Sequence, residues 1–580
     1  MATSHPEKVP PPLQDIPTAK EKKYDRQLRL WGAQGQVALE ETHILLINSG
    51  PGVTGVEALK NLVLPGIGQF SILDSAAVSE ADLGVNFFLD DESLGKFRAE
   101  ETVRLLKELN PGVEGHAITE PLETFIANDK ALSPYSLLLV AAPIDPSVLA
   151  QIQQHAQTLQ IPTFYIHSIG YFSTFSLQLP PAFPIVDTHP DPDSITDLRL
   201  LMPWPALSDF AKEKMQGFGT EAMSTHDKAH IPWIALLLHY LDIWKQQHNG
   251  KVPESFKEKR EFRELVRAGD PNEENFDEAY AAVLKSINPS GKPSSKVQDI
   301  LSAPEAQNLI ADSPAFWVIA HAIAQFVQKH GDLPLPGAVP DMKAVSADYI
   351  RLQNIYKSKA REDAAEVLAT VRQLEKDTGR SPKLSIDEKE VENFCKGAAH
   401  IHLVRGRPLQ IVEPGRPVTF GDRAHDLLTA FRGQMLPGGQ DESLFGLYIA
   451  FLAWDEYVAT HSTSSSEKGG QGLKMPGSAP ESYAEDTMKA MHIADKIVDS
   501  LIKEAGAFVE DPEYTEIISK ADAYAREMVR AGGGELHNIA SLSGGLIAQE
   551  VIKVITRQYI PVDNTCVFDG VASRSHVFRV

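Results

Sequence analysis

The sequence has little cysteine, no excess of positive charge and no long hydrophobic run. Only 2 of its 580 residues are cysteine, Cys395 and Cys566. This excludes a disulfide framework and a cysteine-based zinc site, because both need several thiols at short spacing. No apolar run reaches the ~18 residues that span a bilayer, and residues 1–23 contain no signal-peptide stretch. We expect a reducing compartment, the cytoplasm and/or the nucleus, and no membrane partner.

Acidic residues outnumber basic ones in this chain. It has 78 Asp and Glu against 55 Lys and Arg, which gives a formal net charge of -23 at pH 7. Binding to nucleic acid depends on a basic surface, so we expect no nucleic-acid partner. Hydrophobic residues at 43% and charged residues at 23% are typical of soluble globular proteins with a sizeable core.

Strands and helices alternate in the first third of the sequence. The apolar run over 42–49 (THILLINS) predicts a strand that is buried on both faces of a parallel sheet. Further strands are expected at 70–74, 135–142 and 163–167, and helices at 56–64, 92–109 and 147–159. This alternation indicates right-handed βαβ units and an open, parallel-rich sheet.

Helical periodicity replaces the strand pattern after about residue 180. Apolar residues recur at helical spacing over 233–244 and 349–376. The α/β character returns near the C-terminus, with a helix around 547–558 and short strands at 565–569 and 576–580. We therefore expect an α/β fold with four segments: a flexible tail over 1–20, a first α/β part over 21–180, a mainly helical insertion over 181–530 and a closing α/β part over 531–580.

A glycine-rich turn, Gly50-x-Gly52-x-x-Gly55, separates the first predicted strand from the first helix, and Asp74 ends the next strand. Glycines let a backbone approach closely, a helix N-terminus favours an anionic phosphate, and an aspartate accepts hydrogen bonds from ribose hydroxyls. Two interpretations stay open on this segment alone. One is a dinucleotide site, as in an NAD(P)-binding Rossmann oxidoreductase, and the other is a tight turn that permits close helix–strand packing. No His/Asp or Ser/Tyr-Lys constellation suited to hydride transfer accompanies the turn.

Three other stretches are more specific: 23–32 (KYDRQLRLWG), 55–62 (GVEALKNL) and 543–553 (SGGLIAQEVIK). They resemble the activating enzymes of ubiquitin and ubiquitin-like modifiers. Those enzymes pair an active with an inactive Rossmann-like adenylation fold of the ThiF/MoeB type. They form an acyl-adenylate at the modifier's C-terminal carboxylate and then pass the acyl group to a cysteine as a thioester.

Within that family, the chain is most similar to the regulatory subunits of the heterodimeric enzymes that activate Nedd-type (Rub) modifiers. Matching stretches such as 256–262 (FKEKREF) and 349–354 (YIRLQN) lie in the predicted insertion. The resemblance implies a heterodimer with a catalytic subunit, binding of a Nedd-type modifier and, downstream, contact with the conjugating enzyme. A regulatory subunit of the related Sumo-activating enzyme stays an alternative, because it has the same N-terminal motif, although its helical insertion is shorter.

The chain departs from the active members of the family at residues that handle the nucleotide. The resemblance aligns the family's metal-binding aspartate with Ala76, its phosphate-binding arginine with Val85 and its lysine with Arg98, with Lys96 as a nearby substitute. Phosphoryl chemistry depends on positioned cations. We therefore expect a pseudo-adenylation domain with no catalytic residue of its own.

The resemblance also implies how the turn and the cofactors are assigned. We expect no metal site and no cofactor bound by this chain, with ATP and magnesium used by the partner subunit. A vestigial nucleotide loop would then be formed by Gly50, Gly52, Gly55 and Asp74.

Neither cysteine suits thioester formation, which needs an accessible, activated thiolate. Cys566 falls in a predicted strand of the closing part. Cys395 falls in the insertion that corresponds to the family's cysteine-bearing domain, but Phe394 and acidic residues flank it, so a buried structural thiol is favoured. The alternative, a complete homodimeric enzyme using Cys395, is opposed by Ala76 and Val85.

One residue has a role in trans according to the resemblance. Regulatory subunits of the family contribute the arginine of a Tyr-Asp-Arg motif to the partner's ATP site, and that residue is Arg26 here. The other interpretation is that Arg26 pairs with Asp25, Glu21 or a nearby carboxylate on a solvated helix.

Overall fold

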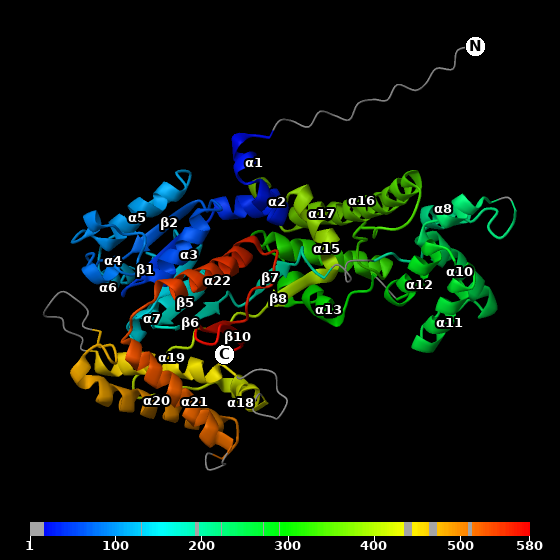
Figure 1. Ribbon diagram of the computed structural model, residues 1–580. Coiled ribbons are helices and arrows are strands. Elements are labelled where there is room, and N and C mark those ends of the chain that lie inside the picture. Colours follow the sequence, from blue (N-terminus) through cyan, green and yellow to red (C-terminus); the bar gives the residue numbers. More distant parts are fainter. Residues whose placement is uncertain are drawn as a thin grey trace. The chain divides into compact units, whose positions relative to one another are not determined.

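The computed structural model describes residues 17–580 except 129, 192–196, 222, 271, 289–290, 434–442, 463–472 and 509–512 (Figure 1). The expected tail therefore falls mostly outside the described residues, and helix α1 (Ala19–Lys23) begins within it. The chain forms two compact units. We call Met1–Phe183 with Val404–Val580 the sheet unit, and Pro184–Leu403 the helical unit.

An eight-stranded sheet forms the centre of the sheet unit, in the order β10-β9-β6-β5-β4-β1-β2-β3. The strands from β3 to β5 in that order run parallel, and β6, β9 and β10 are antiparallel to their neighbours. The α/β, parallel-rich fold expected from the sequence is confirmed. The strands are β1 (His43–Asn48), β2 (Gln69–Leu73), β3 (Glu114–Ile118), β4 (Leu137–Ala141), β5 (Thr163–Ile169), β6 (Phe172–Gln178), β9 (Thr565–Asp569) and β10 (Arg574–Phe578).

Helices α3 (Val53–Val63) and α22 (His537–Thr556), far apart in the sequence, lie side by side in Figure 1. Gly544 makes this possible, because a Cβ there would lie 2.7 Å from the Cβ of Glu57. Among the described residues, α22 is the one helix long and apolar enough to cross a membrane, with a mean hydropathy of 1.3. Half of that stretch is buried against the sheet unit. The helices around the sheet are α2 (Asp25–Glu40), α3 (Val53–Val63), α4 (Glu80–Leu83), α5 (Arg98–Leu109), α6 (Leu122–Ile126), α7 (Pro146–Leu159) and α22 (His537–Thr556).

Glycine and extended backbone set the course of two helices. The helix expected over 92–109 begins only at Arg98, because Gly95 has a φ of +77° and Phe97 is extended. Helix α2 continues from Asp25 to Glu40, with a break at Gly32, where φ is +66°.

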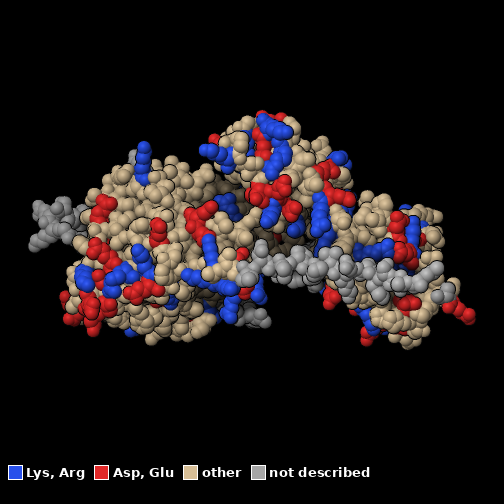
Figure 2. Space-filling view, turned by 90° about the horizontal axis from the view of Figure 1, so that it is seen from above, with Lys and Arg blue, Asp and Glu red and all other residues tan. Residues whose placement is uncertain are grey.

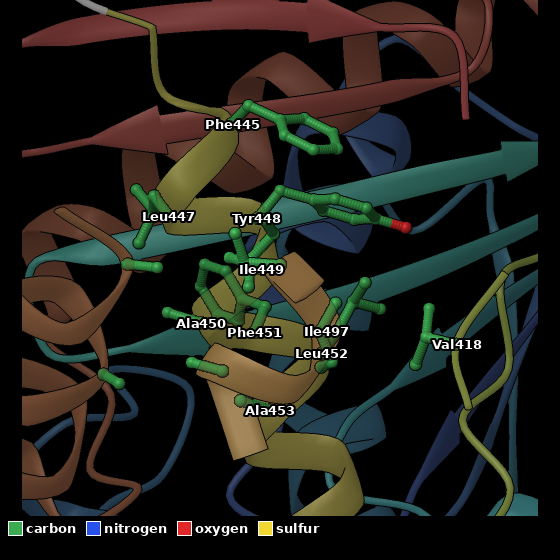
Figure 3. Close-up of a cluster of buried hydrophobic side chains, with 14 of the residues drawn as sticks. Val418, Phe445, Leu447, Tyr448, Ile449, Ala450, Phe451, Leu452, Ala453 and Ile497 are labelled. Atoms are coloured by element: carbon green, nitrogen blue, oxygen red, sulfur yellow. The ribbon is translucent and has the colours of Figure 1, made fainter. Parts of the chain in front are cut away.

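A helical bundle completes the sheet unit. It consists of α18 (Ala424–Gly433), α19 (Phe445–His461), α20 (Tyr483–Glu504) and α21 (Glu513–Ala531). Helix α19 is apolar on all sides, and its side chains pack with α20, α21 and strands β6 and β9 (Figure 3). The insertion expected over 181–530 is thus divided, because an all-round apolar helix must be covered on every side. Residues 404–530 belong to the sheet unit, and 184–403 form a unit of their own.

The bundle meets strand β5 at an acid–base pair, in which the His167 side chain is buried and that of Asp455 is 19% exposed. His167 Nδ1 lies 3.3 Å from Asp455 Oδ1, and the Tyr165 hydroxyl donates to Asp455 Oδ2 at 3.2 Å. Burial lowers the pKa of His167 to about 3. Burial also raises the pKa of Asp455 to about 7, against the hydrogen bond from Tyr165. In the folded protein, the pair therefore holds its one proton on the carboxyl group near pH 6.

Replacing Asp455 with asparagine should make folding stability more sensitive to acid. His167 contributes stability that is lost as pH falls from about 6.5 toward 3, and Asp455 contributes stability that is lost as pH rises toward 7. The two effects cancel between about pH 4 and 6.5. In that range the two side chains together hold one proton in the folded state, on Asp455, and one in the unfolded state, on His167. In Asp455→Asn only the histidine effect remains. We expect it to lose about 1–3 kcal/mol of unfolding free energy, relative to wild type, between pH 6.5 and 4.5.

Urea unfolding of both proteins at the two pH values measures this. Parallel pH dependence of variant and wild type would contradict the assignment.

The helical unit is built almost wholly from helices, and its two-stranded sheet, β7 (Phe183–Val186) with β8 (Ile401–Val404), lies where the chain passes between the units. The aromatic residues of the expected helix at 233–244 are core residues, since Trp233, Tyr240 and Trp244 are buried. The helices are α8 (Pro205–Lys214), α9 (Thr225–Ala229), α10 (Trp233–Gln247), α11 (Phe256–Arg267), α12 (Glu274–Ser286), α13 (Ser295–Leu301), α14 (Pro304–Gln307), α15 (Ala315–His330), α16 (Ser346–Asp377) and α17 (Glu388–Lys396).

Candidate functional site: the glycine-rich turn

The turn between β1 and α3 needs each of its glycines for packing. Gly52 caps α3 with a φ of +64°, in the left-handed region that favours glycine. A Cβ at Gly52 would collide with the Asn48 side chain, and one at Gly50 with the Pro143 ring. A Cβ at Gly55 would lie 2.5 Å from Leu46 Cδ1 on β1. The glycine pattern thus brings α3 close to the sheet whether or not a ligand is bound.

The first backbone N–H groups of α3 bind a carboxylate of the same chain. Val53 N donates to Glu535 Oε2 at 2.6 Å, and Thr54 N donates to Glu535 Oε1 at 3.3 Å. The Thr54 hydroxyl donates to Oε1 at 2.9 Å. Burial raises the pKa of the Glu535 carboxyl, and these hydrogen bonds oppose the rise. A helix N-terminus of this kind is where a nucleotide phosphate binds in related folds.

Asp74 is surrounded by donors from the protein. Its Oδ2 accepts from Arg98 Nε at 2.6 Å and from Asn48 Nδ2 at 2.8 Å. Its Oδ1 accepts from the Ala76 backbone N at 2.9 Å and from an Arg98 terminal nitrogen at 3.2 Å. A carboxylate offers about four lone-pair directions. All four are used here, so none remains for a ribose hydroxyl.

Arg98 joins the turn to two acidic residues. Besides Asp74, its guanidinium donates to Asp82 Oδ1 at 2.9 Å and to the Gly50 carbonyl. Its side chain is 9% exposed, and those of Asp74 and Asp82 are 3% and 9% exposed. Burial opposes the charge of Arg98, but the two carboxylates outweigh it and raise the pKa of the guanidinium. Arg98 therefore holds the turn instead of facing an open phosphate site.

The other substituted positions offer no cation or metal ligand. Ala76 contributes backbone groups: its N–H donates to Asp74, and its carbonyl accepts from the Arg98 backbone N–H at 2.8 Å. Lys96 is half-exposed and lies 3.6 Å from Glu101, so its ammonium serves a surface ion pair. In the described part of the chain, no cluster of three or more His, Cys, Asp or Glu side chains could hold a metal ion.

Both cysteines are buried, Cys395 on α17 and Cys566 on β9. Burial raises the pKa of each thiol to about 12, and nearby carboxylates add to the rise. A thiol with this pKa is almost wholly protonated at neutral pH and is a poor nucleophile.

We expect both thiols of the native protein to resist alkylation by iodoacetamide at pH 7.5, and both to react once the chain is unfolded in urea. Intact-mass spectrometry counts the adducts in each state. Rapid modification of Cys395 in the native protein would contradict its placement as a structural thiol.

Arg26 lies on α2 with an exposed side chain. Its neighbours are engaged elsewhere, because Asp25 pairs with Arg29 at 2.9 Å and Glu21 closes a capping box with Thr18. Within the residues that the structure describes, the Arg26 guanidinium forms no hydrogen bond or ion pair. The pairing with Asp25 or Glu21 that the sequence left open is not formed, and the guanidinium is free to meet another molecule.

Sequence reasoning brought Gly50, Gly52, Gly55 and Asp74 together correctly but missed Glu535 and Asp82. Glu535 follows three glycines and carries no motif of its own, and it lies 482 positions from its partner Val53. No local pattern indicates such a contact. Arg98 was noticed as a substituted lysine, but its partners were not expected.

The sheet order and the turn define an adenylation fold of the ThiF class, and the model of the ThiF family matches residues 24–580. The NEDD8-activating enzyme E1 regulatory subunit of Danio rerio is 35% identical over 98% of this chain and 100% of its own length. The Drosophila melanogaster protein of that name is 34% identical over the whole of both chains, and AXR1 of Arabidopsis thaliana is 32% identical over 98% of each. The chain belongs to the family of NEDD8-activating enzyme E1 regulatory subunits.

The resemblance stated from the three sequence stretches is thus confirmed. The oxidoreductase and the Sumo-type alternatives are not favoured.

Proposed function

We propose that this chain is the regulatory subunit of a NEDD8-activating enzyme, pairs with a catalytic subunit and helps it to activate NEDD8. The observation that carries this proposal is the match to regulatory subunits of that name over nearly the whole length of both chains. A catalytic subunit would use ATP and magnesium to form the acyl-adenylate and would then carry the thioester. The downstream conjugating enzyme is a further partner.

We also propose that the chain is non-catalytic on its own. Two features support this. The turn is closed by the chain itself, as a vestigial nucleotide loop. The N–H groups of Val53 and Thr54 donate to a carboxylate of the same chain, and Asp74 accepts from its guanidinium partner. Both thiols are buried and have a raised pKa, which leaves no cysteine thiolate to accept an acyl group.

Arg26 is the one group proposed to act in the reaction. It is exposed, and its neighbours leave its guanidinium unpaired within the described residues. A guanidinium supplied from another chain stabilises charge spread over phosphate oxygens, as arginine fingers do. The proposed mechanism is therefore burial of an interface together with one arginine contributed to the partner's ATP site.

The surface agrees with protein partners rather than nucleic acid. On the face shown in Figure 2, basic and acidic side chains lie interspersed, without a continuous basic patch.

We propose that the protein works in the cytoplasm, the nucleus or both, which imaging of a tagged chain at native expression would test.

Co-purification of the tagged full chain with mass spectrometry tests the proposed function. We expect a catalytic subunit of a NEDD8-activating enzyme at equal stoichiometry, and NEDD8 when ATP is supplied. Recovery of a Sumo-type catalytic subunit instead would overturn the choice of modifier.

A further inference from the structure

We propose that the side chains of Glu535 and Arg98 occupy the position, at the start of α3 and at Asp74, where related folds bind a nucleotide. The Glu535 carboxylate takes the place of a phosphate, and Arg98 saturates the aspartate that would hold the ribose. The chain thus excludes nucleotides with its own side chains. This inference rests on the proposed non-catalytic role and gives a structural reason for it. The contacts that support it all lie within this chain.

Glu535 occupies the donors that a phosphate would need. The amides of Val53 and Thr54 are the first N–H groups of α3 that have no partner within the helix. They point at the two Glu535 oxygens at 2.6 and 3.3 Å. A phosphate oxygen at the same place would meet those oxygens inside contact distance, and two anions would repel each other. Binding of the carboxylate and of a phosphate is therefore mutually exclusive.

The position of Glu535 is fixed by the fold. Gly170, at the turn between β5 and β6, donates to the Gly534 carbonyl at 2.8 Å, and the backbone of Glu535 forms a bridge with Gly170. Leu536 then caps α22, which packs along α3. The segment that joins α21 to α22 thus holds the Glu535 carboxylate at the turn.

Arg98 closes the second half of the position independently. It contributes two of the four hydrogen bonds that use the Asp74 oxygens, and a third N–H group reaches the Gly50 carbonyl of the turn. The guanidinium therefore lies between the turn and the aspartate. A nucleotide would have to displace both Glu535 and Arg98, so removing one of them opens only one part of the position.

We expect the wild-type full chain not to bind ATP. In equilibrium dialysis with radiolabelled ATP and magnesium at about 1 mM, we expect no saturable binding. Saturable binding of one ATP per chain by the wild type would overturn the inference without the need for any variant.

Glu535→Ala should convert the closed turn into an anion site. A hydrogen bond that involves a charged group contributes about 1.5–3 kcal/mol, so we expect inorganic phosphate to bind the variant roughly 10- to 100-fold more tightly than wild type. The readout is the rise in melting temperature with phosphate, at ionic strength matched with chloride. Glu535→Gln, which keeps the shape and removes the charge, should respond in the same direction but less strongly, because its amide oxygen can still accept from an α3 N–H group. It covers a failure of the alanine variant to fold.

Glu527→Ala is the matched control, because it removes a partly exposed carboxylate of α21 that pairs with Arg530. It should respond to phosphate as the wild type does. An equal phosphate response in wild type, Glu535→Ala and Glu535→Gln would overturn the inference. The measurement uses this chain alone, so it stands apart from the co-purification test of the proposed function.

Discussion

Arg26→Ala should leave the complex with the catalytic subunit intact and slow adenylate formation by that subunit on the order of 10³-fold, the lower end of what arginine fingers contribute. The side chain is exposed and makes no contact in the described residues on which folding depends. Its loss should therefore appear in the rate constant of the chemical step and not in assembly. Pyrophosphate exchange measures adenylate formation, and gel filtration measures assembly.

Arg29→Ala is the control, because Arg29 lies one turn further along α2, is 78% exposed and forms a surface ion pair with Asp25. It should lower the rate less than about twofold, as expected for an exposed ion pair. Arg26→Lys tests the chemistry of the charge, since an ammonium cannot reproduce the planar fork of a guanidinium. Wild-type exchange by Arg26→Ala would remove this residue from the proposed mechanism.

Arg98→Met should destabilise the sheet unit by about 3–5 kcal/mol, because removing one partner of a buried ion pair leaves an uncompensated buried charge. Here two carboxylates, Asp74 and Asp82, lose their common partner. The methionine fills most of the volume, so the effect reports the charge rather than a cavity. Urea unfolding followed by hydrogen exchange of the β2 and α5 amides measures it.

Arg104→Met is the matched control on the same helix. Arg104 also contacts two carboxylates, Asp90 at 3.1 Å and Glu101 at 2.8 Å, but its side chain is 43% exposed. We expect a loss of about 0–1 kcal/mol for this exposed network. Equal losses in the two variants would show that Arg98 does not hold the turn as described.

Four of the parallel strands, β1, β2, β4 and β5, could be predicted from the sequence because they are buried on both faces. Strands β1 and β4 are continuous apolar runs, and the turn after β1 has its glycines where the packing requires them. Such signals are local, and a short window of sequence contains them.

Strands β3 and β6 were not expected, and each has a physical reason. β3 is an edge strand whose side chains are mostly exposed, so it carries no apolar run. β6 (FSTFSLQ) is fully buried, but four of its residues are serine, threonine or glutamine. Those hydroxyls bond to buried partners: Ser173 to Ser543, and Thr174 to the Cys566 carbonyl at 3.0 Å. A core strand whose polar side chains form hydrogen bonds with distant segments has no continuous apolar run, so the sequence alone does not reveal it.

The closure of the turn is non-local in the same way. The glycines and Asp74 were predicted as one site because the strand–turn–helix unit brings them together. Glu535 reaches that site through the packing of α22 on α3. Whether such a turn is open or closed is decided by the tertiary fold.

The central claim is that the covalent chemistry happens on the partner and requires this chain. A non-reducing gel with labelled NEDD8, ATP and magnesium tests it most directly, with the catalytic subunit and this chain present separately and together. We predict a thioester band on the catalytic subunit only when both chains are present, and never on this chain. A reducible NEDD8 band at the mass of this chain, or full labelling of the catalytic subunit in its absence, would contradict the account.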